Sequence, residues 1–460
     1  MSNGPLKGNR RIARGGAFVI SAATLAFSPL AHAQLPAIQL PNVPGVDLPR
    51  TVADTLGGVT NGLEVPRLAE LRQLRVRELL RTQRQYVERD PNGAPIVRAE
   101  IVSFSPSDTA VEGARGAGFE VAREQALDGL DARIVVLRAP QGMSTRRALA
   151  RLRALDPDGA YDFNHIYLDS GGVSKRASVV RLAVAELQAR AGEPISASVL
   201  KVGLIDGGVD VSHPVFREAV IHQHGCADKP VPTAHGTATA SLIVGRSDLF
   251  HGAAPGAELF AADVYCGRPA GGAVDAVVEA MAWIARERAP VINVSLVGPR
   301  NVMLENVVKV VIARGYIVVA AVGNDGAAAP PLYPAAFPGV VGVTGVDARQ
   351  KVLLEAGRGD QVDFAAPGAD MAAAMLSQSF AAVRGTSFAA PIVAGLLAAE
   401  IHEPDPAGAA QAIGRLVNKA VDLGSRGPDR VYGNGLVGNS LRVEPGLALL
   451  APAAARTGIK

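Results

Sequence analysis

The stretch Gly385-Thr386-Ser387-Phe388-Ala389-Ala390-Pro391 places a serine at the start of an apolar run that continues through residues 392–398. Such a run predicts a buried helix, and the glycine before it allows a tight backbone turn. Free N–H groups and the positive end of the helix dipole would then lie near the Ser387 oxygen, which suits a nucleophile. A serine in this position can equally be a helix N-cap, so the stretch alone leaves both interpretations open.

Two segments upstream contain candidate partners for Ser387, because a serine nucleophile needs a base and the base needs an orienting carboxylate. Residues 199–205 predict a buried strand, and Asp206 ends it, where α/β sheets place their chemistry. His235 begins a run of small and apolar residues that predicts a tightly packed helix. Taken singly, Asp206 can be a turn residue before Gly207, and His235 a cap or core residue. Their combination with Ser387 favours catalysis.

A fourth segment, residues 316–326, predicts a buried strand that ends in a turn at Asn324. The Asn324 side-chain amide can donate to an oxyanion that develops during acyl transfer, and one such donor contributes about 3–4 kcal/mol. An Asn-Asp-Gly turn without any catalytic role is the simpler interpretation of the same residues.

The order Asp206, His235, Asn324, Ser387 resembles that of subtilisin-like serine peptidases (subtilases), over about residues 198–440. The resemblance implies that Ser387 is the nucleophile, His235 the general base and then acid, and Asp206 its orienting partner. Asn324 would donate into the oxyanion hole together with the backbone N–H of Ser387. Further matching stretches are residues 291–296, 333–335, 364–368 and 432–437.

The same resemblance implies a fold and a substrate site. The fold class is α/β, a three-layer subtilisin-like fold with a mainly parallel sheet, expected over residues 175–445. Ser295 and Leu296 would pair with the substrate backbone as an added strand. Catalysis would require no cofactor, and structural calcium is left open. The wall of the specificity pocket would be formed by Ala321, Val322 and Gly323.

Two positions depart from the family pattern. Gly207 stands where the family usually has serine or threonine after the aspartate, so Asp206 must find other hydrogen-bond donors. Val297 stands where the family has glycine, with Gly298 one place later, and can narrow the pocket entrance. The leading interpretation is a serine endopeptidase that acts through an acyl-enzyme. The alternative is a catalytically silent subtilase scaffold that acts as a binding protein, although no triad member is lost.

Residues 1–33 have the three parts of a secretory signal peptide: a basic segment, a short apolar segment over 17–27, and the small-x-small site Ala31-His32-Ala33. An uncleaved anchor is the rival interpretation, but the apolar segment is short for a span. The formal net charge of +3 includes four basic residues of this segment, so the remainder is close to neutral. We therefore expect a secreted or periplasmic protein without nucleic-acid binding or a later membrane span.

The segments between the signal and the peptidase-like part differ in composition. Residues 34–66 predict a Pro/Gly-rich linker, residues 67–90 a basic amphipathic docking helix, and residues 446–460 an Ala/Pro-rich tail. Residues 95–170 predict a small α+β domain of the order βαββαβ. By the resemblance it would be a propeptide that assists folding and inhibits, with self-cleavage within residues 167–176. Residues 164–167 are a candidate for the tail that runs into the active site. An unrelated accessory domain is the alternative. The expected strands are 96–103, 119–125, 132–138 and 160–166, and the expected helices are 106–117 and 144–155.

The two cysteines, Cys226 and Cys266, are compatible with one disulfide in an exported protein, or with two buried thiols. His222 and His224 precede Cys226 in a pattern like that of metal ligands, but no second ligand group lies nearby in sequence, so we expect no metal. The expected partners are peptide substrates and the chain's own propeptide, and the expected state is a monomer.

Overall fold

The computed structural model describes residues 71–169, 171–173, 180–181, 200–248, 250–268 and 271–445. The expected signal peptide (1–33), linker (34–66) and tail (446–460) lie outside the described residues. Within the described ranges, no helix combines the length and the apolar character that crossing a membrane requires.

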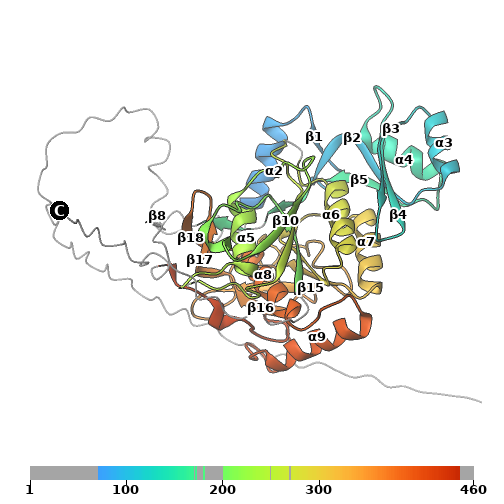
Figure 1. Ribbon diagram of the computed structural model, residues 1–460. Coiled ribbons are helices and arrows are strands. Elements are labelled where there is room, and N and C mark those ends of the chain that lie inside the picture. Colours follow the sequence, from blue (N-terminus) through green and yellow to red (C-terminus); the bar gives the residue numbers. More distant parts are fainter. Residues whose placement is uncertain are drawn as a thin grey trace, which may run out of the picture. The chain divides into compact units, whose positions relative to one another are not determined.

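A seven-stranded sheet with all neighbours parallel forms the centre of the larger domain, in the order β10-β11-β9-β12-β14-β15-β16 (Figure 1). Helices cover both faces, which confirms the predicted three-layer α/β fold. The strands are β9 (Lys201–Asp206), β10 (Val220–His224), β11 (Glu258–Asp263), β12 (Val291–Val294), β14 (Ile317–Ala321), β15 (Val341–Val346) and β16 (Phe364–Pro367). One face carries α5 (Ala234–Val244), α8 (Thr386–Ala398) and α9 (Pro406–Lys419), and the other carries α6 (Val274–Arg286) and α7 (Val302–Ala313).

The residues of β9 show why this sheet is covered on both sides. Successive side chains of a strand point to opposite faces. Val202 and Leu204 belong to the core shared with α5 and α8, whereas Ile205 belongs to the core shared with α6 and α7. Gly203 allows α6 to come close, because a Cβ at this position would lie 2.4 Å from Ile284 Cγ2. The sheet therefore holds Asp206, at the end of β9, in a fully buried place.

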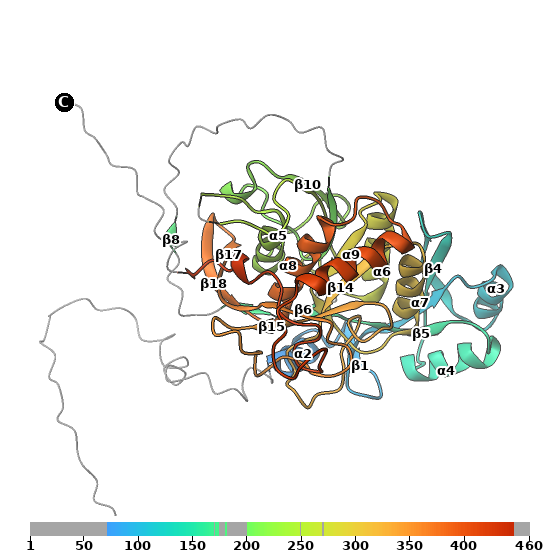
Figure 2. The same cartoon turned by 90° about the horizontal axis from the view of Figure 1, so that it is seen from below.

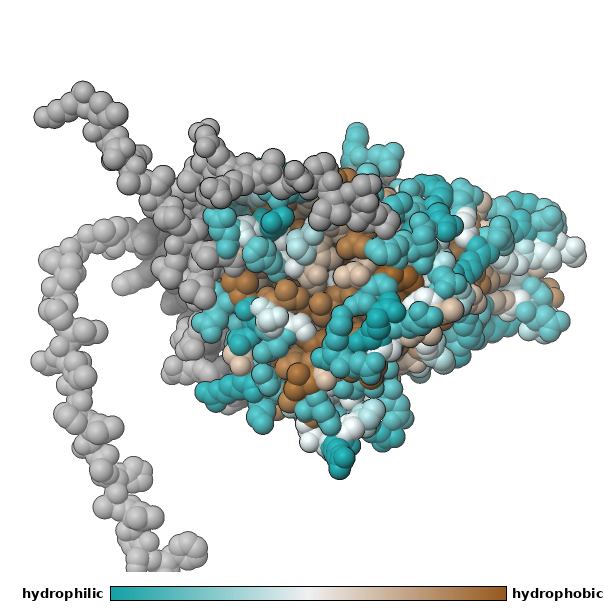
Figure 3. Space-filling view, turned by 60° about the horizontal axis from the view of Figure 1, so that its bottom comes forward, coloured by the Kyte–Doolittle hydropathy of each residue, from teal (hydrophilic) through white to brown (hydrophobic). Residues whose placement is uncertain are grey.

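The small domain, residues 95–165, has the predicted order of elements, βαββαβ. Its antiparallel sheet packs helices on one face through Val135 and Leu137, and packs α6 and α7 on the other face through Ile134 and Val136 (Figures 1 and 2). Successive side chains of the strand Ala132–Arg138 thus belong alternately to two hydrophobic cores. In the view of Figure 3 this domain, at the right, carries mainly hydrophilic side chains outward. Its elements are β2 (Pro95–Phe104), α3 (Asp108–Gly116), β3 (Glu120–Leu127), β4 (Ala132–Arg138), α4 (Thr145–Leu155) and β5 (Tyr161–His165).

Polar contacts tie this small domain to the first turns of α6 and α7, whose N–H groups have no partner within their own helices. The Val302 N–H donates to Asp162 Oδ2 (2.9 Å), and the Asp275 N–H donates to Asn164 Oδ1 (3.4 Å). Arg123 also pairs with the Asp275 carboxylate (2.8 Å). The two domains are therefore joined by an apolar face and by caps on two helices.

The helix predicted over residues 67–90 is shorter than expected. Within the described residues, α2 (Leu71–Thr82) ends well before residue 90, and β1 (Val87–Arg89) follows it. The reason is a tight turn after β1, where the Asp90 N–H donates to Ala94 O and Gly93 has a φ of 88°. This turn pairs β1 with the start of β2 and takes its residues away from the helix.

Short strands complete the fold around the start of α8. β17 (Ala369–Met375) and β18 (Ser379–Arg384) form an antiparallel hairpin that leads into α8. β7 (Gly172–Val173) and β8 (Val180–Arg181) both pair with β18, and β6 (Leu168–Asp169) pairs with β13 (Leu296–Val297). Two single turns of 3₁₀ helix are η1 (Pro214–Phe216) and η2 (Asn439–Leu441).

Candidate active site

Asp206 and His235 meet at the carboxyl edge of the parallel sheet. Asp206 ends β9, and His235 lies in the first turn of α5. His235 Nδ1 is 2.9 Å from both carboxylate oxygens of Asp206. The N-cap residue Thr233 accepts a hydrogen bond from the Gly236 N–H (3.0 Å), which fixes the start of the helix. The two elements together turn the imidazole toward the carboxylate.

Ser387 lies on the other side of the same imidazole. His235 Nε2 is 2.9 Å from Ser387 Oγ. Gly385, with a φ of 142°, allows the turn that brings Ser387 into the first turn of α8. The Ser295 hydroxyl donates to Ser387 O (2.9 Å) and so holds this turn in place. A serine, an imidazole and a carboxylate in one hydrogen-bonded row can activate a hydroxyl for acyl transfer.

The protonation of His235 follows from this setting. Burial lowers its pKa, but the charge of Asp206 and the hydrogen bond to it outweigh burial, so the pKa lies above the ordinary value. The imidazolium form, which exists once His235 has taken a proton, is therefore favoured. A base whose protonated form is stabilised in place suits proton transfer from a hydroxyl.

Position 207 has no side-chain hydroxyl to donate to Asp206, and other groups donate to this carboxylate instead. The Gly207 N–H donates to Asp206 Oδ1 (2.7 Å), and the Thr239 hydroxyl lies 3.2 Å from Oδ2. Space for a side chain at position 207 is absent, since a Cβ there would come within 2.4 Å of Thr233 Oγ1. Sequence reasoning missed Thr239, although its position four residues after His235 places both on one helix face.

Asn324 lies beside the residue that precedes Ser387. The Thr386 N–H donates to Asn324 Oδ1 (3.1 Å), and the Gly323 N–H donates to Thr386 Oγ1 (3.1 Å). These two bonds tie the loop after β14 to the start of α8. Because the oxygen of the Asn324 amide is held by Thr386, its NH₂ group is oriented as a donor.

The edge predicted to bind substrate is occupied by the chain itself. Leu296 pairs with Asp169 and Val297 pairs with Leu168, in an antiparallel register. On this segment, the Tyr167 N–H donates to Gly272 O (2.7 Å). An extended segment that follows the small domain therefore lies along the site as an added strand.

This segment continues across the serine. Gly171 is so close that a Cβ on it would lie 2.3 Å from Ser387 Oγ and 2.5 Å from Phe388 Cε2. Ser387 has no exposed surface. Beyond it, Gly172 pairs with Arg384 of β18.

The interpretation of residues 164–167 as a tail that ends at the serine needs correction. Tyr167 donates through its hydroxyl to Pro299 O (2.7 Å), and its ring fills the space beside Gly298. Of the described residues of this segment, Gly171 lies over the serine, because β6 carries the chain further along the edge of β13. The residues of the expected pocket wall, Ala321, Val322 and Gly323, are all buried.

The two cysteines form a disulfide between Cys226 and Cys266, with a Cα–Cα distance of 5.2 Å. Their sulfurs lie near Asp263 in the one metal-ligand-like group of the described residues, but bonded sulfurs are not thiolate ligands. His224 instead stacks on Trp283, with ring centroids 4.7 Å apart, and contacts Glu279 (2.6 Å).

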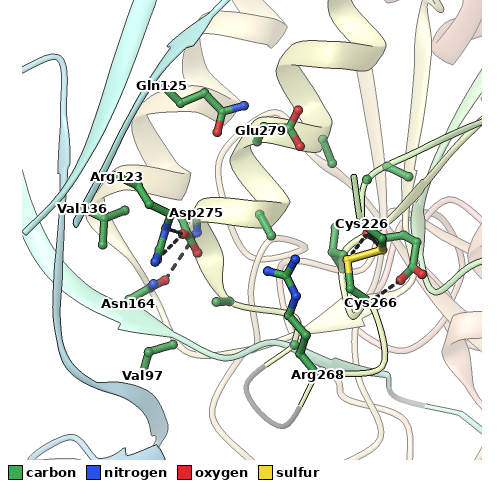
Figure 4. A pocket seen from close by; sticks show the side chains of 18 of the residues that line it. Val97, Arg123, Gln125, Val136, Asn164, Cys226, Cys266, Arg268, Asp275 and Glu279 are labelled. Carbon is green, nitrogen blue, oxygen red and sulfur yellow. Dashed lines mark hydrogen bonds and ion pairs between the residues drawn. A yellow bond between two sulfur atoms is a disulfide. The ribbon is translucent and has the colours of Figure 1, made fainter. Parts of the chain in front are cut away.

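The disulfide borders a cavity of about 350 Å³ between the small domain and α6 (Figure 4). Arg123, Asn164 and Asp275 lie next to one another on one side of it, and the disulfide lies on the opposite side. Asp206, His235 and Ser387 are not among its lining residues. The cavity is therefore a feature of the contact between the domains, separate from the catalytic candidates.

Comparison with known proteins gives consistent sequence matches. A sequence model of the subtilase family matches residues 198–435. Subtilisin E of Bacillus subtilis (strain 168) is 29% identical over 298 residues, which cover 61% of this chain and 74% of that protein. Subtilisin of Bacillus pumilus is 30% identical over 253 residues, 52% of this chain and 89% of the relative. The minor extracellular protease Epr of Bacillus subtilis (strain 168) is 30% identical over 246 residues, and the match spans only 37% of its length.

A solved structure shows the same fold. It is the crystal structure of fervidolysin from Fervidobacterium pennivorans, a keratinolytic enzyme related to subtilisin. The similarity has a TM-score of 0.61 at 21% sequence identity and covers 78% of this chain and 61% of that one.

Proposed function

Because this chain belongs to the subtilase family of serine peptidases, we propose that it is a secreted serine endopeptidase made as a self-processed precursor. The observation that carries the proposal is the position of His235, 2.9 Å from Ser387 Oγ on one side and 2.9 Å from the Asp206 carboxylate on the other. All three members of the triad are present, which disfavours a silent scaffold.

In the proposed reaction, Ser387 Oγ attacks the carbonyl carbon of a peptide bond while His235 Nε2 takes the hydroxyl proton. Asp206 stabilises the imidazolium that forms. The Asn324 NH₂ group and the Ser387 N–H donate to the oxyanion of the tetrahedral intermediate. His235 then gives the proton to the leaving amine, and water releases the acyl-enzyme by the same steps in reverse order.

We expect a serine-directed phosphonate to label the processed enzyme at Ser387 and to stop its peptide hydrolysis. The labelling rate should fall at acidic pH, because His235 must be neutral to accept the proton of the Ser387 hydroxyl. Its pKa is raised, so the neutral form predominates only above a pH higher than the ordinary value of about 6.5. Labelling measured by mass spectrometry across a pH series checks this. Hydrolysis that persists in fully labelled protein would exclude Ser387 as the nucleophile.

We further propose that residues 95–170 are a propeptide and that self-cleavage, expected within residues 167–176, occurs at the bond that precedes Gly171. The pairing of β6 with β13 supports this, since it aligns the segment as a substrate would be aligned. The closeness of Gly171 to Ser387 Oγ supports the position of the bond. The small domain would then remain as an inhibitor until it is released.

Replacing Gly171 with valine should slow self-cleavage by at least about 100-fold, since misplacing reacting atoms by about 1 Å has effects of this size. The added side chain would overlap Ser387 Oγ, which His235 holds in place. Gly172→Val is the matched control, because a Cβ at Gly172 meets nothing within 4 Å. Gel analysis of precursor and product with N-terminal sequencing measures the effect. Normal cleavage of Gly171→Val with an unchanged new N-terminus would refute the assigned bond.

We propose secretion or a periplasmic location on the basis of the signal-like residues 1–33. The expected partners are peptide substrates and the chain's own propeptide. No cofactor takes part in the proposed reaction, because the triad and the oxyanion donors supply every proton transfer and charge contact that it needs.

A further inference from the structure

Helix α2 carries two arginines, Arg72 and Arg75, at a spacing that places both on one face. Arg72 reaches the loop after β14: its Nε lies 2.8 Å from both carboxylate oxygens of Asp325, and its Nη2 lies 2.5 Å from Oδ2. The Asp325 side chain is only 7% exposed, so this pair is largely shielded from water. Asp325 directly follows Asn324, so Arg72 anchors α2 next to the proposed oxyanion donor.

Arg75 reaches the segment that crosses the serine. Its Nη1 donates to the carboxylate and to the backbone O of Asp169, the latter at 3.3 Å, and its Nη2 donates to Gly171 O (3.3 Å). One guanidinium therefore holds backbone carbonyls on both sides of residue 170. The rigid fork of an arginine fixes the relative position of two acceptors, which a single ammonium cannot do.

Two different parts of the chain thus hold this segment. β13 pairs with Leu168 and Asp169, and Arg75 binds the carbonyls of Asp169 and Gly171. A segment fixed at both ends across the scissile bond has few other conformations available. Such restriction favours the geometry of attack by Ser387.

The charge of Arg75 also matters to the base. The Asp169 carboxylate raises the pKa of His235 and Arg75 lowers it, after the larger effects of burial and of Asp206. Arg75 therefore compensates a carboxylate that the precursor brings close to the imidazole.

We propose that Arg75 is a positioning residue for self-cleavage, with α2 anchored by Arg72 on Asp325. This inference rests on the proposed self-processing, and it makes α2 part of the precursor's cleavage machinery in addition to the small domain. The basic face of the helix binds the enzyme's own acidic groups and backbone carbonyls.

The test follows cleavage of the labelled full chain during a chase after cell-free synthesis. Arg75→Gln should slow the appearance of product on the order of 10- to 100-fold, and Arg72→Gln by about 3- to 10-fold. Arg75→Lys keeps the charge but not the fork, so it should recover part of the rate. Arg77→Gln is the control, because the described residues give this exposed arginine of α2 no hydrogen bond or ion pair, and its rate should stay within about twofold of the wild type.

Three outcomes separate the possibilities. Wild-type rates for both Arg75→Gln and Arg72→Gln, with no cleavage of Ser387→Ala, would overturn the positioning role and leave the proposed function standing. Cleavage of Ser387→Ala would instead overturn self-processing itself. A misfolded Arg75→Gln is detected in the uncleaved Ser387→Ala background. There the positioning role requires the same Tm as that of Ser387→Ala alone, and a loss of Tm as large as that of a core variant contradicts it.

Discussion

Ser387→Ala is expected to abolish peptide hydrolysis and removal of the small domain together. The Ser387 hydroxyl makes the hydrogen bond to His235 Nε2, and alanine keeps the Cβ, so α8 should fold unchanged. Loss of the nucleophile in enzymes of this kind lowers kcat by roughly six orders of magnitude. The measurement is hydrolysis of a peptide substrate together with the size of the purified chain.

The matched control for this variant is Ser425→Ala, an exposed serine outside the site, which should be processed and active as the wild type is. Processing of Ser387→Ala in a preparation free of other proteases would contradict the assignment of the nucleophile. Equal loss in both serine variants would point to a folding defect instead.

The second large effect is expected at Asn324. Asn324→Ala should lower kcat by about 100- to 1,000-fold with a much smaller change in KM, because its NH₂ group bonds to the oxyanion only after attack has begun. Steady-state kinetics on a short peptide substrate measures both constants.

Asn324→Asp distinguishes a catalytic from a structural role. It keeps an oxygen that can accept from the Thr386 N–H but removes the NH₂ donor. A purely structural Asn324 would therefore tolerate aspartate, whereas the oxyanion role predicts a loss at least as large as that of alanine. Near-normal kcat in Asn324→Asp would rule out the donor role.

Much of the fold could be predicted from residue patterns. Aliphatic runs that end in Asp206 or before Asn324 predicted buried strands, and these are β9 and β14. The apolar run after Ser387 predicted a buried helix, which is α8. These predictions succeed because strand and helix periodicity depends on local sequence. The helix over residues 67–90 was predicted too long, because the pairing of β1 with β2 outweighs helical spacing beyond Thr82.

The candidate site was predicted less completely. The order of four motifs pointed to Asp206, His235, Asn324 and Ser387, and the structure brings them to one edge of the sheet. The Thr233 side chain that occupies the space beside Gly207 could not be predicted, because it depends on how closely α5 approaches β9. The support of Asp206 by Thr239 depends on the same approach.

The sequence by itself determined which chemical groups this protein has, their order, and the local elements that carry them, since these depend on residue type and short-range periodicity. Only the tertiary structure decided that Gly171 lies over Ser387. It also decided that Arg72 holds Asp325 in the loop after β14 and that Arg75 holds the segment that contains Gly171. These contacts join residues about one hundred to more than two hundred positions apart. Such distances close only when the packing of the small domain on α6 and α7 brings both parts of the chain together, and no local pattern records that packing.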